Sequence, residues 1–223
     1  MYIMKKSYKI KEIFYTLQGE GAQSGRPAIF CRFSKCNLWN GKEKDRALSA
    51  CSFCDTDILG TDGRNGGEYI SALDLAIAVN NLWPNKNGKP FVVCTGGEPA
   101  LQLDEDLIEN FHQLGFEVAI ETNGTLPLPS GIDWICCSPK GSSKVVIKHC
   151  NELKLVFPQR DAMPENFSHI KAEFYYLTPM AEPLPLEYIH PNKDRVTQEA
   201  LQFCLDNPKW RLNLQIHKVL NIS

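Results

Sequence analysis

From residue 91 onward, short apolar segments alternate with amphipathic ones, and this alternation constrains the fold more than any other feature of the chain. Segments rich in β-branched and aromatic residues predict strands at 91–99, 117–124, 133–140, 152–157 and 172–180. Between the first two strands, residues 104–116 carry apolar side chains at helical spacing, namely Leu107, Ile108, Phe111 and Leu114. Strands that alternate with helices indicate parallel βαβ units.

The flanking segments extend this pattern in both directions. Further elements are predicted as a strand at 28–34, helices at 71–83 and 196–208, and a last strand at 210–218. Ser71 is placed as the N-cap of its helix, with Asp74 three residues later, and Pro208 ends the last helix. Six or seven strands with few helices are fewer than the eight units of a complete barrel. We therefore predict an α/β fold, a partial, open (β/α) barrel of about six parallel strands in a single domain, residues 1–223.

Composition and charge exclude several classes of function. Apolar residues make up 43% and charged residues 22% of the chain, as in ordinary globular proteins. The formal net charge is −2 and there is no basic run, so no nucleic-acid partner is predicted. No stretch approaches the roughly 20 apolar residues that span a bilayer, and residues 1–14 lack the apolar core of a signal peptide, so no membrane partner is expected. Nine cysteines, an odd number at scattered spacings, favour a reducing cytoplasmic location over a secreted disulfide framework.

Polar residues cluster directly after the predicted strands. They occur at 95–98, 121–123 and 138–140, at Thr178 and at 215–217. In parallel α/β proteins, the carboxyl ends of the strands form the edge at which ligands bind. We expect the functional site at this edge.

Three cysteines have the spacing of a metal-binding set: fourteen residues separate Cys36 from Cys51, and two separate Cys51 from Cys54. A structural zinc ion takes four ligands, and either Cys31 or His112 would complete the set. Cys31, however, lies within a predicted apolar strand, where a free cysteine usually behaves as a small buried hydrophobe. The spacing alone leaves zinc and an iron–sulfur cluster as equal alternatives.

An iron–sulfur cluster would have a distinct chemical consequence. Three thiolates on a [4Fe–4S] cluster leave one iron without a protein ligand, and that iron can bind a small molecule. The long segment 37–50 is compatible with this, because each doubling of loop length costs only about 0.6 kcal/mol. Residues 36–54 are called the cluster loop below.

Several motifs narrow the choice when they are taken together. They are YTLQGEGAQSGRPAIFCRFSKCNLW at 15–39, CDTD at 54–57, TGGEPALQ at 95–102, ETNGT at 121–125, SPK at 138–140 and QIHKVLNIS at 215–223. This set resembles the radical S-adenosylmethionine (SAM) enzymes and, among them, the family of 7-carboxy-7-deazaguanine synthases. The usual radical SAM trio has three residues between its first two cysteines, so the fourteen found here depart from it, although some of these synthases carry such an enlarged loop.

The resemblance implies a [4Fe–4S] cluster on Cys36, Cys51 and Cys54, with SAM on the open iron. One-electron reduction then yields a radical that abstracts hydrogen from the substrate. The residues that the resemblance implies for SAM binding are Phe53, Asp55, Thr95, Gly96, Gly97, Glu98, Glu121, Asn123, Ser138, Lys140 and Thr178.

Each of these SAM residues also has a plain structural interpretation. Gly96 and Gly97 permit close backbone approach, but they also suit an ordinary strand-to-helix turn. Glu98 either accepts from the SAM amino group or caps the next helix, and Asn123 begins an Asn-Gly pair that is common in turns. The family has Gln where this chain has Thr178, so a contact between Thr178 and SAM departs from the family pattern.

The implied substrate is 6-carboxy-5,6,7,8-tetrahydropterin, a flat, polar bicycle with a carboxylate. The residues implied for it are Leu17, Gln18, Gly19, Glu20, Gly21, Arg32, Thr95, Gly97, His217 and Ser223. A carboxylate such as Glu20 can accept paired hydrogen bonds from the N–H edge of a pterin, whereas the alternative is a solvent-facing side chain in a glycine-rich turn. Arg32 needs an acidic partner in its strand, and we expect the substrate carboxylate rather than a structural aspartate. His217 is placed in the last strand, and Ser223 would act through its terminal carboxylate.

Magnesium, the electron donor and the assembly complete the implications of the resemblance. Thr56 is the implied Mg²⁺ ligand, in keeping with the preference of this ion for oxygen, and Asp55 and Asp57 are expected to act chiefly as loop caps. The implied enzyme is a carbon–nitrogen lyase that contracts the pterin ring with loss of ammonia, in the biosynthesis of deazapurines such as queuosine. We expect a homodimer and a donor such as flavodoxin, for which the charged segment 41–46 is a candidate docking surface. The alternatives are another small radical SAM enzyme, such as a glycyl-radical activase, and a non-catalytic zinc-binding module.

Overall fold

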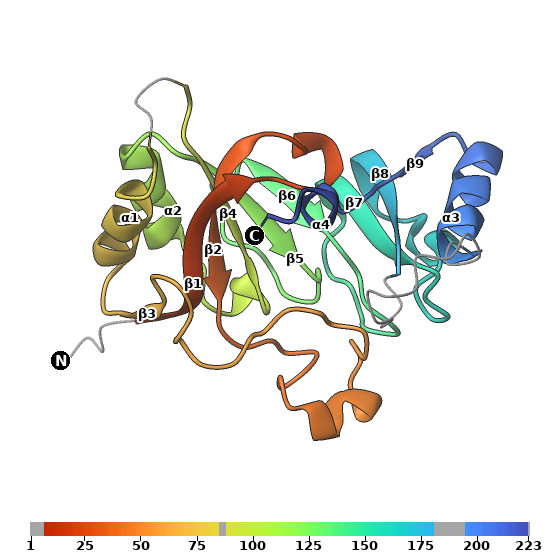
Figure 1. Cartoon of the computed structure of the whole chain (residues 1–223), viewed down its shortest axis with the longest axis horizontal. Coiled ribbons are helices and arrows are strands. Elements are labelled where there is room, and N and C mark those ends of the chain that lie inside the picture. Colours follow the sequence, from red (N-terminus) through yellow and green to blue (C-terminus); the bar gives the residue numbers. More distant parts are fainter. Residues whose placement is uncertain (1–6, 85–87, 181–194, 223) are drawn as a thin grey trace.

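A nine-stranded sheet organises the protein. The computed structural model describes residues 7–84, 88–180 and 195–222. In them, the sheet has the order β3-β1-β2-β4-β5-β6-β7-β8-β9 (Figure 1). The strands are β1 Tyr8–Leu17, β2 Pro27–Phe33, β3 Gly67–Tyr69, β4 Phe91–Gly96, β5 Glu117–Thr122, β6 Trp134–Cys137, β7 His149–Phe157, β8 Lys171–Pro179 and β9 Trp210–Leu212.

Few helices accompany this sheet. The α-helices are α1 Ala72–Asn80, α2 Glu105–Gln113, α3 Arg195–Asp206 and α4 Ile216–Leu220, and the 3-10 helices are η1 Gly21–Gln23, η2 Glu43–Leu48, η3 Pro99–Leu101 and η4 Pro164–Phe167. Strands β2 and β4 to β9 pair in parallel, in chain order. The predicted open α/β sheet with few helices is therefore confirmed, with seven parallel strands in the described part of the chain rather than about six.

The sequence analysis named no strand before residue 28, yet β1 is among the longest strands. It pairs antiparallel with β2, and the register shifts between Ile10 and Glu12. This irregularity breaks the strict alternation by which a strand is recognised, so that Ile10 and Ile13 are both fully buried although they are three residues apart. Antiparallel β1 and β3 thus extend the parallel sheet at one edge.

Helices α1, α2 and α3 lie at the two ends of the sheet (Figure 1). Helices α1 and α2 pack on the β1, β2 and β4 end around a core that includes Leu75, Leu107 and Phe111, whereas α3 packs at the β8–β9 end. The predicted N-cap is confirmed, because the Ser71 hydroxyl accepts from the Asp74 N–H. No helix in the described ranges is long and apolar enough to cross a membrane.

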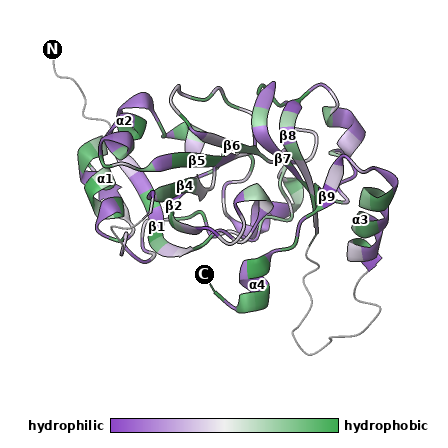
Figure 2. Ribbon diagram, turned by 90° about the horizontal axis from the view of Figure 1, so that it is seen from above, coloured by the Kyte–Doolittle hydropathy of each residue, from purple (hydrophilic) through white to green (hydrophobic). Residues whose placement is uncertain are grey.

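The last predicted strand is wrong beyond its first three residues. Strand β9 ends at Leu212, and the chain then turns into the short helix α4. The Ile216 N–H donates to the Gly19 carbonyl at 3.0 Å, which ties the start of α4 to the loop after β1. Figure 2 shows α4 on one side of the sheet, away from α1, α2 and α3. His217 therefore comes from a helix over the sheet and not from a strand within it.

Candidate active site

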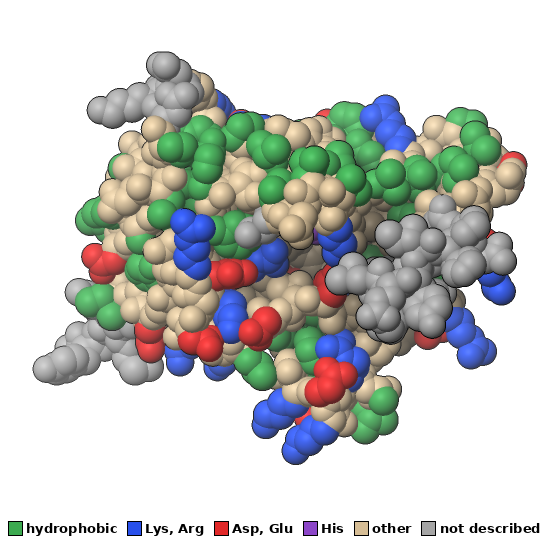
Figure 3. All heavy atoms as spheres, in the orientation of Figure 1, with side chains coloured by type: hydrophobic (Ala, Val, Ile, Leu, Met, Phe, Trp, Pro, Cys, Tyr) green, Lys and Arg blue, Asp and Glu red, His purple; other side chains and the backbone are tan. Residues whose placement is uncertain are grey.

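A cavity of about 560 Å³ opens beside the carboxyl ends of the parallel strands, within the range of small-molecule sites. Figure 3 shows side chains of both charges gathered on the face between the main body and the projecting cluster loop. The sequence-predicted residues that line the cavity are Leu17, Gln18, Gly19, Glu20, Arg32, Cys36, Cys51, Phe53, Cys54, Asp55, Thr56, Thr95, Gly96, Gly97, Glu121, Asn123, Ser138, Lys140, Thr178 and His217. Gly21 and Glu98 are not among its lining residues, and Ser223 lies outside the described residues.

The three cysteines of the cluster loop share one end of this cavity. The Cys51 thiol donates to the Cys54 sulfur, which lowers the pKa of Cys54 to about 6. The positive charge of Lys140 favours the thiolate forms of both Cys51 and Cys54 and so acts to lower the pKa of each. The cluster loop is fastened by Arg46, whose Nη1 donates to the Cys54 carbonyl at 2.8 Å.

Neither predicted fourth zinc ligand reaches this set. Cys31 is fully buried in β2, and His112 lies on α2 with Nε2 2.9 Å from Asp133 Oδ2. Among the described residues, no three His, Cys, Asp or Glu side chains are grouped to hold a metal ion. Three soft thiol donors that share one cavity fit an iron–sulfur cluster with an open iron better than they fit a four-ligand zinc site.

Gly96 and Gly97 bring the first cysteine to the cavity by close backbone packing. Gly96 has φ +108°, and a Cβ at Gly97 would meet the Lys35 carbonyl oxygen at 1.9 Å. The Gly97 N–H donates to the Phe33 carbonyl at 3.0 Å, so the end of β4 lies against the segment that leads into Cys36. The glycine pair therefore fixes the Cys36 segment, whatever else its backbone binds.

Glu98 has the structural role that the sequence left open. It is fully buried, its Oε1 accepts from the Ala100 N–H and the Thr122 hydroxyl, and its Oε2 accepts from the Asn123 N–H. Burial raises the pKa of Glu98, and these donors oppose that shift. The Glu98 carboxylate thus joins η3 to the end of β5, which is the capping role predicted as the alternative to SAM binding.

Asn123 supports the cluster loop from the next strand end. Its Nδ2 donates to Asn37 Oδ1 at 2.9 Å, and Asn37 Nδ2 donates to the Thr125 hydroxyl at 2.7 Å. Thr178 likewise has a protein partner, since its hydroxyl accepts from Asn213 Nδ2 at 2.8 Å. Asn123 and Thr178 both line the cavity, and each also hydrogen-bonds to a neighbouring segment of the protein.

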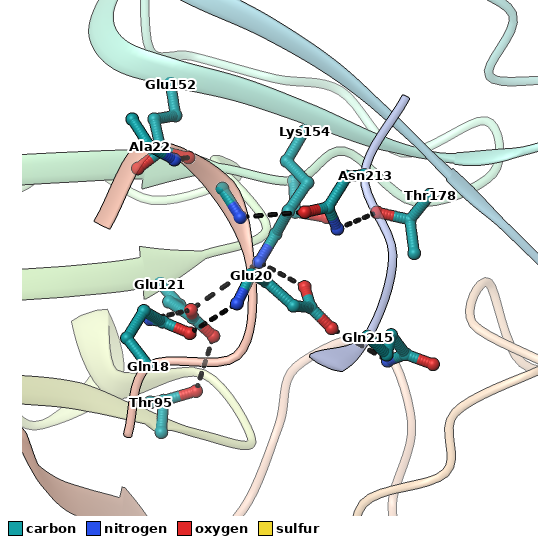
Figure 4. Close-up of polar contacts among 12 residues, drawn as sticks. Gln18, Glu20, Ala22, Thr95, Glu121, Glu152, Lys154, Thr178, Asn213 and Gln215 are labelled. Carbon is teal, nitrogen blue, oxygen red and sulfur yellow. Dashed lines mark hydrogen bonds and ion pairs between the residues drawn. The ribbon is translucent and has the colours of Figure 1, made fainter. Parts of the chain in front are cut away.

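A buried network of carboxylates and one ammonium forms the floor of the cavity (Figure 4). Lys154 Nζ lies 2.6 Å from Glu20 Oε2 and 3.5 Å from Glu121 Oε1. Gln215 Nε2 donates to the other Glu20 oxygen at 2.7 Å. Gln18 Nε2 and the Thr95 hydroxyl donate to the two Glu121 oxygens, each at 3.1 Å.

The charges of this network are set by its internal pairs. Burial would raise the pKa of Glu20, but the charge and hydrogen bond of Lys154 and the bond from Gln215 lower it to about 2. Burial would lower the pKa of Lys154, but the neighbouring Cys136, Glu121 and Glu20 hold it above its ordinary value. At neutral pH the floor therefore presents the ionised Glu20 carboxylate beside the Lys154 ammonium.

Lys154 was missed by the sequence analysis. It lies in β7 with a side chain only 9% exposed, on the same strand face as Glu152 and Val156. The signal was available, because a lysine in the middle of the apolar segment ELKLVF demands a partner as Arg32 does in its own strand.

Arg32 has an acidic partner within the protein. From the sequence, such a partner was the alternative to the substrate carboxylate. Its Nε lies 3.1 Å from Oε1 of Glu12 in β1, and its guanidinium lies over the Phe14 ring at 5.4 Å. The partner is a glutamate from the unpredicted strand rather than an aspartate. Arg32 and Glu12 both line the cavity.

The glycine-rich turn after β1 carries Glu20 and packs against the start of α4. A Cβ at Gly19 would meet His217 Nδ1 at 2.5 Å, so only glycine allows this approach of the imidazole. Gly21 has φ +69°, donates to Asn213 Oδ1 at 2.8 Å, and would clash with Glu152 if it carried a Cβ. Gly21 therefore has a structural role in joining this turn to Asn213. Burial lowers the pKa of His217, which lines the cavity beside Glu20.

The CDTD segment places the Thr56 hydroxyl between two paired carboxylates. Thr56 lines the cavity, whereas Asp57 accepts from the Leu59 N–H at 3.0 Å and pairs with Lys11 Nζ at 2.6 Å. Asp55 pairs with Lys218 Nζ at 3.0 Å. The loop-cap role predicted for Asp57 is present in the structure.

Known proteins match this chain over almost its whole length. It is 55% identical over 216 residues to the 7-carboxy-7-deazaguanine synthase of Bordetella pertussis and 53% identical over 216 residues to that of Caulobacter vibrioides, covering 97% of this chain and 99% of each relative. A crystal structure of QueE from Escherichia coli matches with a TM-score of 0.71 and 27% identity, over 95% of both chains. No family model matches the chain. The full-length identities nevertheless show that the chain belongs to the 7-carboxy-7-deazaguanine synthase family.

Proposed function

We propose that the protein converts 6-carboxy-5,6,7,8-tetrahydropterin to 7-carboxy-7-deazaguanine with loss of ammonia, as a radical SAM enzyme. The observation that carries this proposal is one cavity lined both by the thiols of Cys36, Cys51 and Cys54 and by the carboxylates of Glu20 and Glu121. The names of the relatives, which are 48–55% identical over nearly their full length, support the same reaction.

Cys36, Cys51 and Cys54 would hold a [4Fe–4S] cluster, and the residues around the end of β4 would meet SAM. When bound and reduced, this pair supplies a radical that removes hydrogen from the substrate. The chain positions its own groups for that purpose: Gly96 and Gly97 fix the Cys36 segment, and Ser138 and Lys140 lie on the same cavity wall.

The carboxylate floor suits the pterin. Glu20 is held ionised by Lys154, and an ionised carboxylate accepts strong hydrogen bonds from an aminopyrimidine N–H edge. Arg32 has five donors and is paired with the Glu12 carboxylate, and it offers its remaining donors and its charge to the substrate carboxylate. His217 borders Glu20 from α4 and would contact the same ring.

Mg²⁺, the electron donor and the assembly belong to the same proposal. Thr56 would give Mg²⁺ one hydroxyl ligand, with substrate and water supplying the rest of an oxygen-rich shell. A donor such as flavodoxin would reduce the cluster, and the cluster loop, which projects from the body in Figure 1, is the candidate docking surface. We further propose a homodimer and a cytoplasmic location.

The direct test is product formation by anaerobically reconstituted protein. Incubation with SAM, reductant, Mg²⁺ and the carboxypterin is expected to give 7-carboxy-7-deazaguanine, identified by mass, together with ammonia. The Cys36→Ala variant should form none, whereas Cys204→Ala, outside the cavity, should retain activity. Failure of the wild-type protein, with a full cluster, to convert this substrate would reject the proposal.

The two alternatives make different predictions. A glycyl-radical activase would act on a protein partner and would leave the carboxypterin unchanged. A zinc-binding module would be colourless with one zinc ion and no iron. Neither alternative agrees with the names of the full-length relatives.

A further inference from the structure

Lys154 occupies an unusual position for a lysine, because its ammonium is buried at the floor of the cavity. There it contacts the carboxylates of two other segments. Glu20 comes from the turn after β1, and Glu121 from β5. Lys154 itself projects from β7 with a side chain 9% exposed. Figure 4 shows its ammonium between the two carboxylates. An unpaired charge here would be costly, so this contact is a fixed part of the folded protein.

The two carboxylates depend on Lys154 to different degrees. Glu121 receives a hydrogen bond on each oxygen from Gln18 and Thr95, and Lys154 is its more distant partner at 3.5 Å. Among the described residues, the ammonium at 2.6 Å is the only charged hydrogen-bond donor to Glu20, and the other side-chain donor is Gln215 on the segment leading into α4. Removal of Lys154 would therefore leave Glu121 with both of its hydrogen bonds from Gln18 and Thr95, whereas Glu20 would keep only the hydrogen bond from Gln215 among the described residues.

A small second cavity lies beside Lys154 and these carboxylates. It measures about 10 Å³, near the volume that one water molecule needs, and Glu20, Glu121, Glu152 and Lys154 all line it. A shorter side chain at 154 would open this space to the Glu20 side chain. Lys154 thus keeps Glu20 turned toward the main cavity as well as ionised.

We propose that Lys154 is a positioning residue, whose ammonium holds the Glu20 carboxylate in the orientation that meets the N–H edge of the bound pterin. This inference rests on the proposed function. Other titratable groups also face the network: Glu152 on β7, Cys136 on β6 and Glu121 on β5 face Lys154, and His217 on α4 faces Glu20. With Lys154 replaced by an apolar side chain, Glu20 loses the cation that lowers its pKa, and burial then favours the protonated form of this carboxyl.

The test compares Lys154→Met, Lys154→Arg and Lys171→Met in reconstituted holoenzyme. Lys171 is an exposed lysine at the start of β8 and serves as the matched control. Iron content, SAM affinity and SAM cleavage without substrate report on the fold and on the cofactor end of the cavity. The KM for the carboxypterin, and its dependence on pH from 6 to 9, report on Glu20.

Lys154→Met is expected to raise this KM at least tenfold at pH 7 while SAM affinity changes less than threefold. The KM should fall again toward pH 9, as the protonated carboxylate ionises, whereas the wild-type KM lacks this recovery. Lys154→Arg keeps the positive charge, so its KM should depend on pH as in the wild-type protein. Its guanidinium is wider than an ammonium and should displace Glu20, which raises the KM severalfold.

Two results would overturn the inference. One is a wild-type KM and pH profile in Lys154→Met, or in Lys154→Arg if the methionine variant does not fold. The other is a loss of SAM cleavage in proportion to product, which would make Lys154 a general structural residue. Failure of the proposed function differs from both, because the wild-type enzyme and Lys171→Met would then also give no product.

Discussion

Lys218 Nζ lies 3.0 Å from Asp55 Oδ2, and this ion pair joins α4 to the segment that directly follows Cys54. The neighbouring His217 lines the cavity beside Glu20. The pair therefore connects the candidate cluster end and the candidate substrate end of one site across its open side.

Lys218→Met tests this connection. The two side chains are 46% and 64% exposed, so the pair contributes at most about 1 kcal/mol to stability and is screened by salt. We expect an unchanged melting temperature but a KM for the carboxypterin two- to fivefold higher at low ionic strength, with the difference lost at about 0.5 M salt. Lys148→Met, at an exposed lysine before β7, is the control. An unchanged KM at low salt would show that α4 is held without this pair.

Gly97→Ala should displace the first cysteine. The added methyl would meet the Lys35 carbonyl at 1.9 Å, and backbone cannot yield as a flexible side chain can. We expect a loss of more than about 2 kcal/mol in the free energy of unfolding, and iron incorporation well below that of the wild-type protein.

The matched control is Gly67→Ala, because the Cβ at Gly67 would meet only Tyr69 at 3.8 Å. Its iron content should equal that of the wild-type protein. Full iron loading of Gly97→Ala would mean that the Cys36 segment is not fixed by the glycine pair.

Glu20→Gln should change how stability depends on pH. The pKa of Glu20 is about 2 in the folded protein, against 4.5 for the free side chain, because Lys154 and Gln215 outweigh burial. A lowered carboxyl pKa stabilises the fold above pH 4.5, and this stabilisation is lost as pH falls toward 2. Between pH 7 and pH 3 the wild-type protein should lose about 2 kcal/mol more than Glu20→Gln does.

Urea unfolding with an iron chelator in both samples measures this difference without a contribution from cluster loss. Parallel loss of stability in the two proteins would indicate that Glu20 does not carry the low pKa.

The parallel sheet and most of the cavity lining could be predicted from the sequence, because both follow from local patterns. Strands such as 91–96 are continuous apolar runs, and polar residues directly after them fall at one edge of a parallel sheet. The motif resemblance then pointed to the cluster loop and to Glu20 and Glu121, all of which line the cavity.

What could not be predicted depends on contacts between distant segments. The register shift in β1 hides its alternation, so Glu12 was not foreseen as the partner of Arg32. Glu98 was assigned to SAM because no sequence pattern shows that Thr122 and the Asn123 N–H already occupy it. Lys154 meets Glu20 across 134 positions of the chain, and only the folded sheet brings them together.

The central claim is that three cysteines hold an iron–sulfur cluster whose remaining iron is open to SAM. The most direct measurement is iron content with the electron paramagnetic resonance spectrum of the anaerobically reduced protein, with and without SAM. We predict about four irons per chain and a spectrum that SAM alters. We also predict retention of both in Cys31→Ala, which changes a fully buried residue outside the cavity, and loss of both in Cys36→Ala. One tightly bound zinc per chain, or a cluster spectrum that SAM leaves unchanged, would contradict the claim.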